Sequence, residues 1–77
     1  MTTKTYTAVA STKHNIGIYD AESGNYIKSL FVTTGEIIGQ PIISAKTITV
    51  TYTEGGNNWM AVFDINSHNL IRKQSLV

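Results

Sequence analysis

The sequence predicts an all-β fold of about seven antiparallel strands in one domain of 77 residues. Threonine, isoleucine, valine and tyrosine dominate, and these residue types favour strands. The stretch 46–53 alternates threonine with apolar residues, the period of two expected of a strand. The stretch 16–28 recurs as 60–72, a shift of 64 − 20 = 44 residues. Four pairs are identical across this shift, namely Asp20/Asp64, Ser23/Ser67, Asn25/Asn69 and Ile27/Ile71.

The first repeat covers about 3–34 and is predicted to hold three strands, at 4–11, 15–20 and 25–33. The first of these strands resembles 46–53 at a shift of 42, since Lys4, Thr5 and Thr7 match Lys46, Thr47 and Thr49. The second strand runs into a turn rich in Asp, Ser, Gly and Asn. We expect the Asp20 carboxylate to accept backbone N–H groups two residues on, as aspartate does in such turns.

The second repeat covers about 35–77 and is predicted to hold four strands, at 36–44, 46–53, 58–65 and 69–76. The strand 36–44 has no counterpart in the first repeat. It contains Pro41, which cannot donate to a β-ladder, so we expect it at a sheet edge or a bulge. The basic residues Lys28, Arg72 and Lys73 fall on the outermost strands, where such side chains discourage stray pairing.

The run Trp59–Phe63 is apolar without interruption. Successive side chains of a strand point to opposite faces, so Met60 and Val62 point one way and Ala61 the other. A half-exposed strand would alternate with polar residues, and we therefore expect both faces of this strand to be covered. Two repeats alone cannot cover all of their faces, so the sequence predicts association with further copies.

The runs 18–30 and 62–71 resemble the third-to-fourth-strand hairpin of β-propeller blades. The WD40, YVTN and PQQ-type families share this pattern of an apolar-aromatic-Asp run, a Ser/Thr-Gly turn and an apolar-basic strand. The chain departs from it, because Tyr19 and Phe63 replace the tryptophan of WD40 repeats and the closing tryptophan of PQQ-type repeats is missing. The resemblance implies two antiparallel β-meander blades per chain in an oligomeric propeller; the alternative is a small β-sandwich or barrel.

Propellers have 4–8 blades. Two blades per chain therefore imply a homo-oligomeric ring of two to four chains, and we favour a trimer. A ring of identical chains is closed and head-to-tail. Cysteine is absent, so no disulfide staples a chain of this size, and association is the remaining means of stabilisation.

Charge and hydropathy exclude several classes of protein. Six Lys plus Arg face five Asp plus Glu, with no basic run, so no nucleic acid is expected as partner. No stretch approaches the roughly 20 apolar residues of a membrane span. The first residues lack the apolar core of a signal peptide. We expect a soluble, cytoplasmic protein, with a place in a virion as the alternative.

No catalytic set is recognisable, so we expect no enzyme, no cofactor and no metal site. Asp20 and Asp64 lie in equivalent turns, a blade apart, and are interpreted as turn caps. A calcium loop beginning at Asp64 would have His68 at its fifth position, where an oxygen ligand is needed, and Ser75 at its twelfth, where a glutamate is needed. The candidate ligand or interface residues are aromatic, and core packing is the alternative for two of them, Trp59 and Phe63. The candidates are Trp59, Tyr19, Tyr26 and Phe63.

Three functions agree with these observations. The first is a non-enzymatic binding or interaction module that self-assembles into a propeller-like ring and presents loops to a protein partner. The second is a structural component of a larger assembly, such as a virion protein. The third is a carbohydrate-binding lectin whose aromatic residues stack on sugar rings between blades.

Overall fold

The computed structural model describes residues 5–44 and 46–76. Residue 4, where the first predicted strand begins, and the ends of the predicted domain at 1 and 77 lie outside these ranges. The described residues form strands and no helix, which confirms the all-β prediction. The strands are β1 (Tyr6–Ala10), β2 (Asn15–Asp20), β3 (Tyr26–Phe31), β4 (Glu36–Ser44), β5 (Thr47–Glu54), β6 (Asn57–Asp64) and β7 (Leu70–Ser75).

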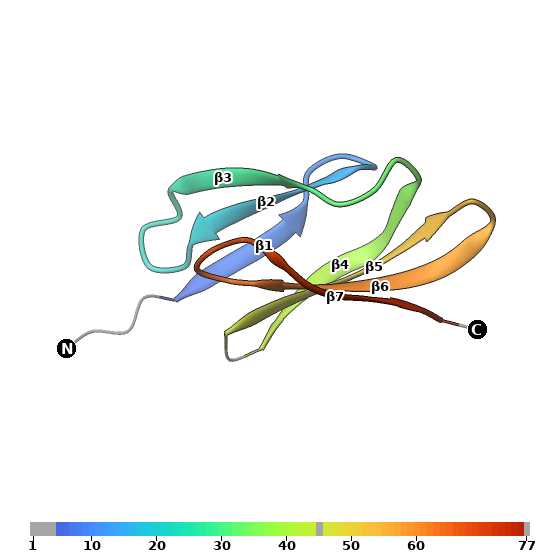
Figure 1. Cartoon of the computed structure of the whole chain (residues 1–77). Helices are drawn as coiled ribbons and strands as arrows, with labels where there is room; N and C mark the ends of the chain where they lie inside the picture. Colours follow the sequence, from blue (N-terminus) through green and yellow to red (C-terminus); the bar gives the residue numbers. More distant parts are fainter. Residues whose placement is uncertain (1–4, 45, 77) are drawn as a thin grey trace.

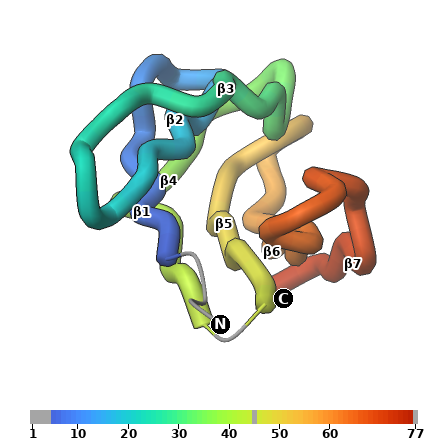
Figure 2. Tube along the Cα trace, turned by 90° about the vertical axis from the view of Figure 1, so that its left-hand side faces the viewer, coloured from blue at the N-terminus to red at the C-terminus, as the bar shows by residue number. Residues whose placement is uncertain are grey.

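The strands form two antiparallel sheets, one of three strands in the order β1-β2-β3 and one of four in the order β4-β5-β6-β7. Figure 1 shows the three-stranded sheet lying over the four-stranded one. β1 and β4 lie side by side between the sheets (Figure 2). The Gln40 side-chain oxygen accepts a hydrogen bond from the Ala10 N–H at 3.1 Å, which joins these two strands. Within the described ranges, no helix is long and apolar enough to cross a membrane.

The core lies between the facing sides of the two sheets, which we call the inner faces. Every second residue of β5 is buried, as the alternation of the strand requires. The three-stranded sheet contributes side chains from β2, which pack against side chains from β5 and β6. The core residues, each at most 6% exposed, are Ile16, Ile18, Ile48, Val50, Tyr52, Ala61, Phe63 and Ile65.

The other side of each sheet, its outer face, is not covered within the subunit. Ala61 and Phe63 of β6 point into the core, whereas Met60 and Val62 lie on the outer face and are only half-buried. One face of β6 is therefore covered, where the sequence predicted two. The reason is that the chain supplies two layers and each layer buries one face against the other.

The hairpins β2–β3 and β6–β7 pair in the same way. In both, the register shifts at the same place, before the aromatic residue that precedes the aspartate. The extra residue of this bulge is Ile27 in the first hairpin and Ile71 in the second. The equivalent cross-strand pairs are Ile18 with Lys28 and Val62 with Arg72, then Tyr19 with Tyr26 and Phe63 with Leu70.

The turns of the two hairpins also share their hydrogen bonds. The Asp20 carboxylate accepts from the Glu22 N–H at 2.9 Å, and the Asp64 carboxylate accepts from the Asn66 N–H at 3.3 Å. The predicted turn-capping role of both aspartates is confirmed. Each turn also contains a residue with positive φ at the same position, a glycine in the first hairpin and His68 in the second.

The predicted shift of 42 between the first strands of the repeats is wrong by one residue. The Thr5 carbonyl accepts from the Ala21 N–H at 3.0 Å, and the Lys46 carbonyl accepts from the Ile65 N–H at 2.9 Å. Thr5 is therefore equivalent to Lys46, a shift of 46 − 5 = 41. The shift of 42 aligned the threonines of the two strands. The shift of 41 aligns the residues that pair with equivalent positions of β2 and β6.

β4 is an edge strand, and its pairing with β5 is interrupted between Ile38 and Ile42. Gly39 has a φ of 67° in this interruption, a conformation that costs glycine little. The prediction that Pro41 marks an edge or a bulge is confirmed. The predicted edge position of the basic residues is also confirmed, because Lys28 lies on β3 and Arg72 and Lys73 lie on β7.

His68 should make folding depend on pH. Its Nε2 is buried and has no hydrogen-bond partner among the described residues. Burial lowers the pKa of His68 below 6.5, with a further lowering by Lys28 and an opposing effect of Asp64. The unfolded chain therefore binds a proton that the folded chain does not. The free energy of unfolding should fall as pH decreases through about 6.5 and level off below the folded pKa.

The measurement is denaturant unfolding at several values between about pH 5 and 8, where histidine titrates. The variant His68→Asn, whose side chain tolerates positive φ, should lose this pH dependence. The control His14→Asn should keep it. Identical pH profiles for the original protein and His68→Asn would contradict the assignment.

Candidate functional site

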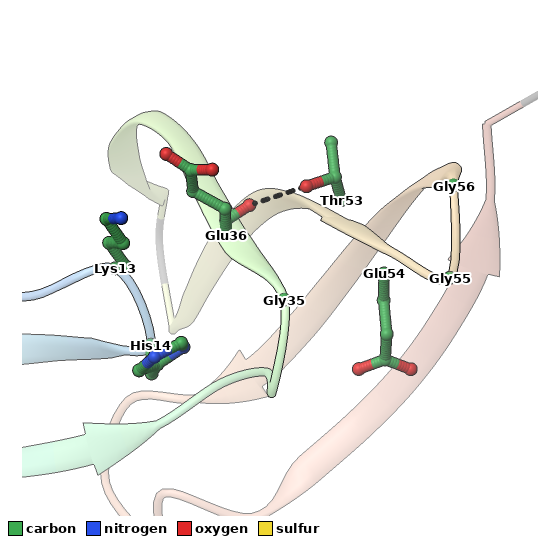
Figure 3. A pocket seen from close by; sticks show the side chains of 8 residues that line it. All are labelled: Lys13, His14, Gly35, Glu36, Thr53, Glu54, Gly55 and Gly56. Atoms are coloured by element: carbon green, nitrogen blue, oxygen red, sulfur yellow. Dashed lines mark hydrogen bonds between the residues drawn. The ribbon is translucent and has the colours of Figure 1, made fainter.

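A cleft of about 480 Å³ opens at one end of the two sheets (Figure 3). Three connections line it together with the strand ends beside them: the β1–β2 turn with Lys13 and His14, the β3–β4 loop and the start of β4 with Gly35 and Glu36, and the end of β5 and the β5–β6 turn with Thr53–Gly56. Its volume lies in the range of about 300–1,000 Å³ that is usual for ligand pockets. It lies where the two repeats meet, since the β1–β2 turn belongs to the first and the β5–β6 turn to the second.

Backbone hydrogen bonds hold the first two connections together. The Ile37 N–H donates to the Lys13 carbonyl at 2.8 Å, and the Val32 N–H donates to the His14 carbonyl at 2.8 Å. The side-chain hydroxyl of Thr53 donates to the Glu36 carbonyl at 3.3 Å, which ties the second connection to β5 (Figure 3). The wall of the cleft is thus fixed by the main chain.

Thr33 anchors the β3–β4 loop beneath the cleft. It is a buried polar residue, 1% exposed, and its hydroxyl is satisfied in both directions. The hydroxyl donates to Glu54 Oε1 at 2.8 Å and accepts from the Gly35 N–H at 2.9 Å. Buried polar groups are stable only when they are paired in this way. The loop is therefore held at Glu54.

Glu54 also binds the outermost strand. Its Oε2 accepts from Lys73 Nζ at 3.3 Å, and its carbonyl accepts from the Trp59 indole N–H at 3.2 Å. Lys73 Nζ in turn lies 4.8 Å from the centre of the Trp59 ring. The hydrogen bonds from Thr33 and then from Lys73 lower the pKa of Glu54. Glu54 is therefore ionised at neutral pH and has no proton to give as a general acid.

The groups free to meet a ligand in the cleft are the side chains of Lys13, His14 and Glu36. Within residues 5–44 and 46–76 these three make no hydrogen bond and no ion pair. They offer donors and acceptors of both charge signs, from the β1–β2 turn and from the start of β4. Such a set suits a polar ligand rich in hydroxyl groups rather than an apolar one.

The structure brings two of the four candidate aromatic residues together. Tyr19 and Tyr26 are cross-strand partners on the outer face of the three-stranded sheet, with ring centres 5.6 Å apart and an interplanar angle of 71°. The Tyr19 ring lies over Gly17, where an added Cβ would meet it at 3.2 Å. Tyr26 is 59% exposed. Together they form an exposed aromatic corner.

The other two candidates lie elsewhere. Phe63 is 6% exposed and belongs to the core, so within the subunit it presents no surface to a ligand. Trp59 lies on β6, where its indole N–H donates to the carbonyl of the cleft residue Glu54 and its ring lies under Lys73 Nζ. Both lie on the four-stranded sheet and pair with β5 and β7, whereas the aromatic corner belongs to the three-stranded sheet.

Sequence reasoning did not select the residues that line the cleft. The available signal was the alternation of the chain, because every second turn of an antiparallel meander lies at the same end of the sheet. The turns that contain Lys13, Glu36 and Gly55 satisfy this rule. What the pattern could not show is that two separate sheets place these turns against one another.

Comparison with known proteins adds no relative: no protein-family model matches the chain, and no curated protein and no solved structure is similar to it.

Gly35 should be necessary for the cleft. A Cβ at this position would overlap the Thr53 carbonyl oxygen, so Gly35→Ala must displace backbone. We expect a loss of about 3 kcal/mol in the free energy of unfolding, the upper part of the range for overpacking. Gly17→Ala is the matched control, since its closest contact would be the movable Tyr19 ring and the Ser11 side chain would lie at ordinary contact distance, and it should cost less than about 1 kcal/mol. Equal effects in denaturant unfolding would refute the close approach.

Proposed function

We propose that the chain is a non-enzymatic binding or interaction module that assembles with further copies of itself into a propeller-like ring. The observation that carries this proposal is the chemistry of the two outer faces. They lie on opposite sides of the subunit. One has no charged side chain at its strand positions, and the other has apolar side chains at its centre and its charges at strand ends or on an edge strand.

The outer face of the three-stranded sheet has no charged side chain at its strand positions. Its aromatic residues Tyr26 and Phe31 are 59% and 57% exposed, and Val9, on β1 of the same face, is 43% exposed. The strand positions of this face are Thr7, Val9, Asn15, Gly17, Tyr19, Tyr26, Ser29 and Phe31. Protein interfaces have the same character, with aromatic residues enriched and charges depleted at their centre.

The outer face of the four-stranded sheet is apolar at its centre. Ile38 and Ile42 of β4 are 44% and 65% exposed, and Met60 and Val62 of β6 are half-buried. Threonines of β5 lie between them. The charged residues of this face, Glu36, Asp64 and Arg72, stand at strand ends or on the edge strand. A single subunit leaves these apolar side chains in water.

Covering these faces would also stabilise a chain of this length. A domain of under roughly 80 residues seldom gains enough stability from one core, and association is one of the usual remedies. Here the buried hydrophobic side chains number eight in the described part of the chain. Burying further apolar surface contributes about 25 cal/mol for each Å². Assembly of copies therefore supports the fold as well as the function.

The solution mass tests this function. We expect a mass of two to four times the subunit mass of 8.4 kDa, with three times favoured. Light scattering coupled to size exclusion, repeated over a dilution series, measures it. The midpoint of thermal unfolding should rise with protein concentration, because association stabilises the folded state by mass action. A strict monomer that unfolds cooperatively at every concentration would end the proposal.

Glycan binding is a second candidate, and the cleft favours it. The cleft lies between the repeats, has the volume of a ligand pocket and offers the free side chains of Lys13, His14 and Glu36. Sugar hydroxyl groups both donate and accept hydrogen bonds, as these side chains require.

A glycan array followed by titration calorimetry of any hit tests this candidate. Glu36→Gln should weaken binding about tenfold, since a hydrogen bond to a charged group contributes about 1.5–3 kcal/mol. Asn66→Gln, in an exposed turn remote in sequence from all three connections, should leave the affinity unchanged. An array without hits, or equal affinity for both variants, would count against glycan binding in the cleft.

A further inference from the structure

We propose that copies of this chain associate front to back, with the outer face of the three-stranded sheet of one copy packed on the outer face of the four-stranded sheet of the next. This inference rests on the proposed self-assembly and specifies its interface. Its basis is the way in which the two repeats already pack within one chain.

The equivalence of the two hairpins is fixed by their hydrogen bonds and not only by the sequence. The bulge falls at the same place, and the N–H of each aspartate donates to the carbonyl of the asparagine five residues on, at 2.9 Å in both. The left-handed residue, Gly24 with φ 77° or His68 with φ 66°, closes each turn. Each residue of β2 therefore has an equivalent in β6, 44 positions later.

Equivalent residues lie on opposite faces. Ile16 and Ile18 point into the core and are 0% exposed, whereas their equivalents Met60 and Val62 lie on the outer face. The aromatic residue that precedes each turn aspartate shows the reverse arrangement. Tyr19 lies on an outer face, whereas its equivalent Phe63 lies in the core. The front of the first repeat thus packs on the back of the second.

This arrangement excludes a two-fold relation between the repeats. Under a two-fold axis, equivalent residues would occupy the same face and would both be buried. We call the face with Ile16 and Ile18, or with their equivalents Met60 and Val62, the front of a repeat, and the face with Tyr19 or Phe63 its back. Front-to-back packing leaves the back of the first repeat and the front of the second uncovered. These two faces are complementary to each other, and neither is complementary to itself. Repetition of such a heterologous contact adds copies in one direction until the ring closes.

The contact within the chain serves as a template for the contact between chains. Met60 and Val62 of one copy would take the place that Ile16 and Ile18 hold within the chain. Tyr19 of the next copy would take the place of Phe63, and Gly17 that of Ala61. The charge nearest this contact is Arg72, the cross-strand partner of Val62 on the edge strand. Its equivalent Lys28 is the cross-strand partner of Ile18 in the contact within the chain and remains exposed there.

The test uses one variant for each face. Tyr26→Lys places a charge on the outer face of the three-stranded sheet, and Ile42→Lys places one on the outer face of the four-stranded sheet. Both residues are more than half exposed, at 59% and 65%, so the subunit should still fold, as circular dichroism will show. Should either be insoluble, Phe31→Lys or Ile38→Lys replaces it on the same face.

Each variant alone should lose assembly and have the subunit mass of 8.4 kDa in light scattering. An equimolar mixture of the two should form a 1:1 complex of twice that mass, because each variant still has the face that the other lacks. The control Asn66→Lys carries the same charge on an exposed turn outside both faces, and it should assemble like the original protein.

Three results overturn the inference while leaving self-assembly intact. They are a variant that still assembles by itself, a mixture that stays monomeric, and a mixture in which either variant pairs only with its own kind. If the original protein is itself monomeric, the proposed function fails, and this interface fails with it.

Discussion

The structure depends on the contact between Ile16 and Ile18 of β2 and the alternating apolar residues of β5 and β6. These side chains pack the two sheets, which share no strand pairing, against each other. Between the sheets, the main additional links are made by loops and by the Gln40 side chain. Since a strand turns every second residue to the same side, this contact assigns every other residue to an outer face. The core thus determines which surface the molecule shows.

Polar interactions hold the two sheets together at the end that carries the cleft. Thr33, Glu54 and Lys73 form one chain of hydrogen bonds from the β3–β4 loop to the outermost strand. The exposed ion pair contributes little by itself, because water screens it. The ion pair instead positions other groups, because it holds Lys73 over the Trp59 ring and Glu54 beside the β5–β6 turn. The cleft is shaped by this network.

Much of the fold could be predicted from the sequence, because alternation and turn residues are local signals. The three-then-four order of strands, the turn role of Asp20 and Asp64 and the irregularity at Pro41 all followed from such signals. Three features could not be predicted in this way. The predicted alignment of β1 with β5 was wrong by one residue, because the threonines of both strands lie on outer faces, and the outer faces of the two sheets are not equivalent faces of the repeat. The cleft depends on turns from separate sheets. The burial of Phe63 in the core and the position of its equivalent Tyr19 on an outer face depend on how the repeats stack.

The interruption of β4 has a consequence for unwanted aggregation. A regular edge strand offers unpaired N–H and C=O groups to any other chain, which is how amyloid-like growth begins. Here the left-handed Gly39 bends one edge, Pro41 removes a donor from it, and Gln40 occupies the Ala10 N–H on the adjacent edge. The opposite edges carry Lys28 and Arg72. Each of the four sheet edges thus has a feature that disfavours the addition of a further strand. The protein can therefore expose apolar side chains on its faces without forming fibrils through its edges.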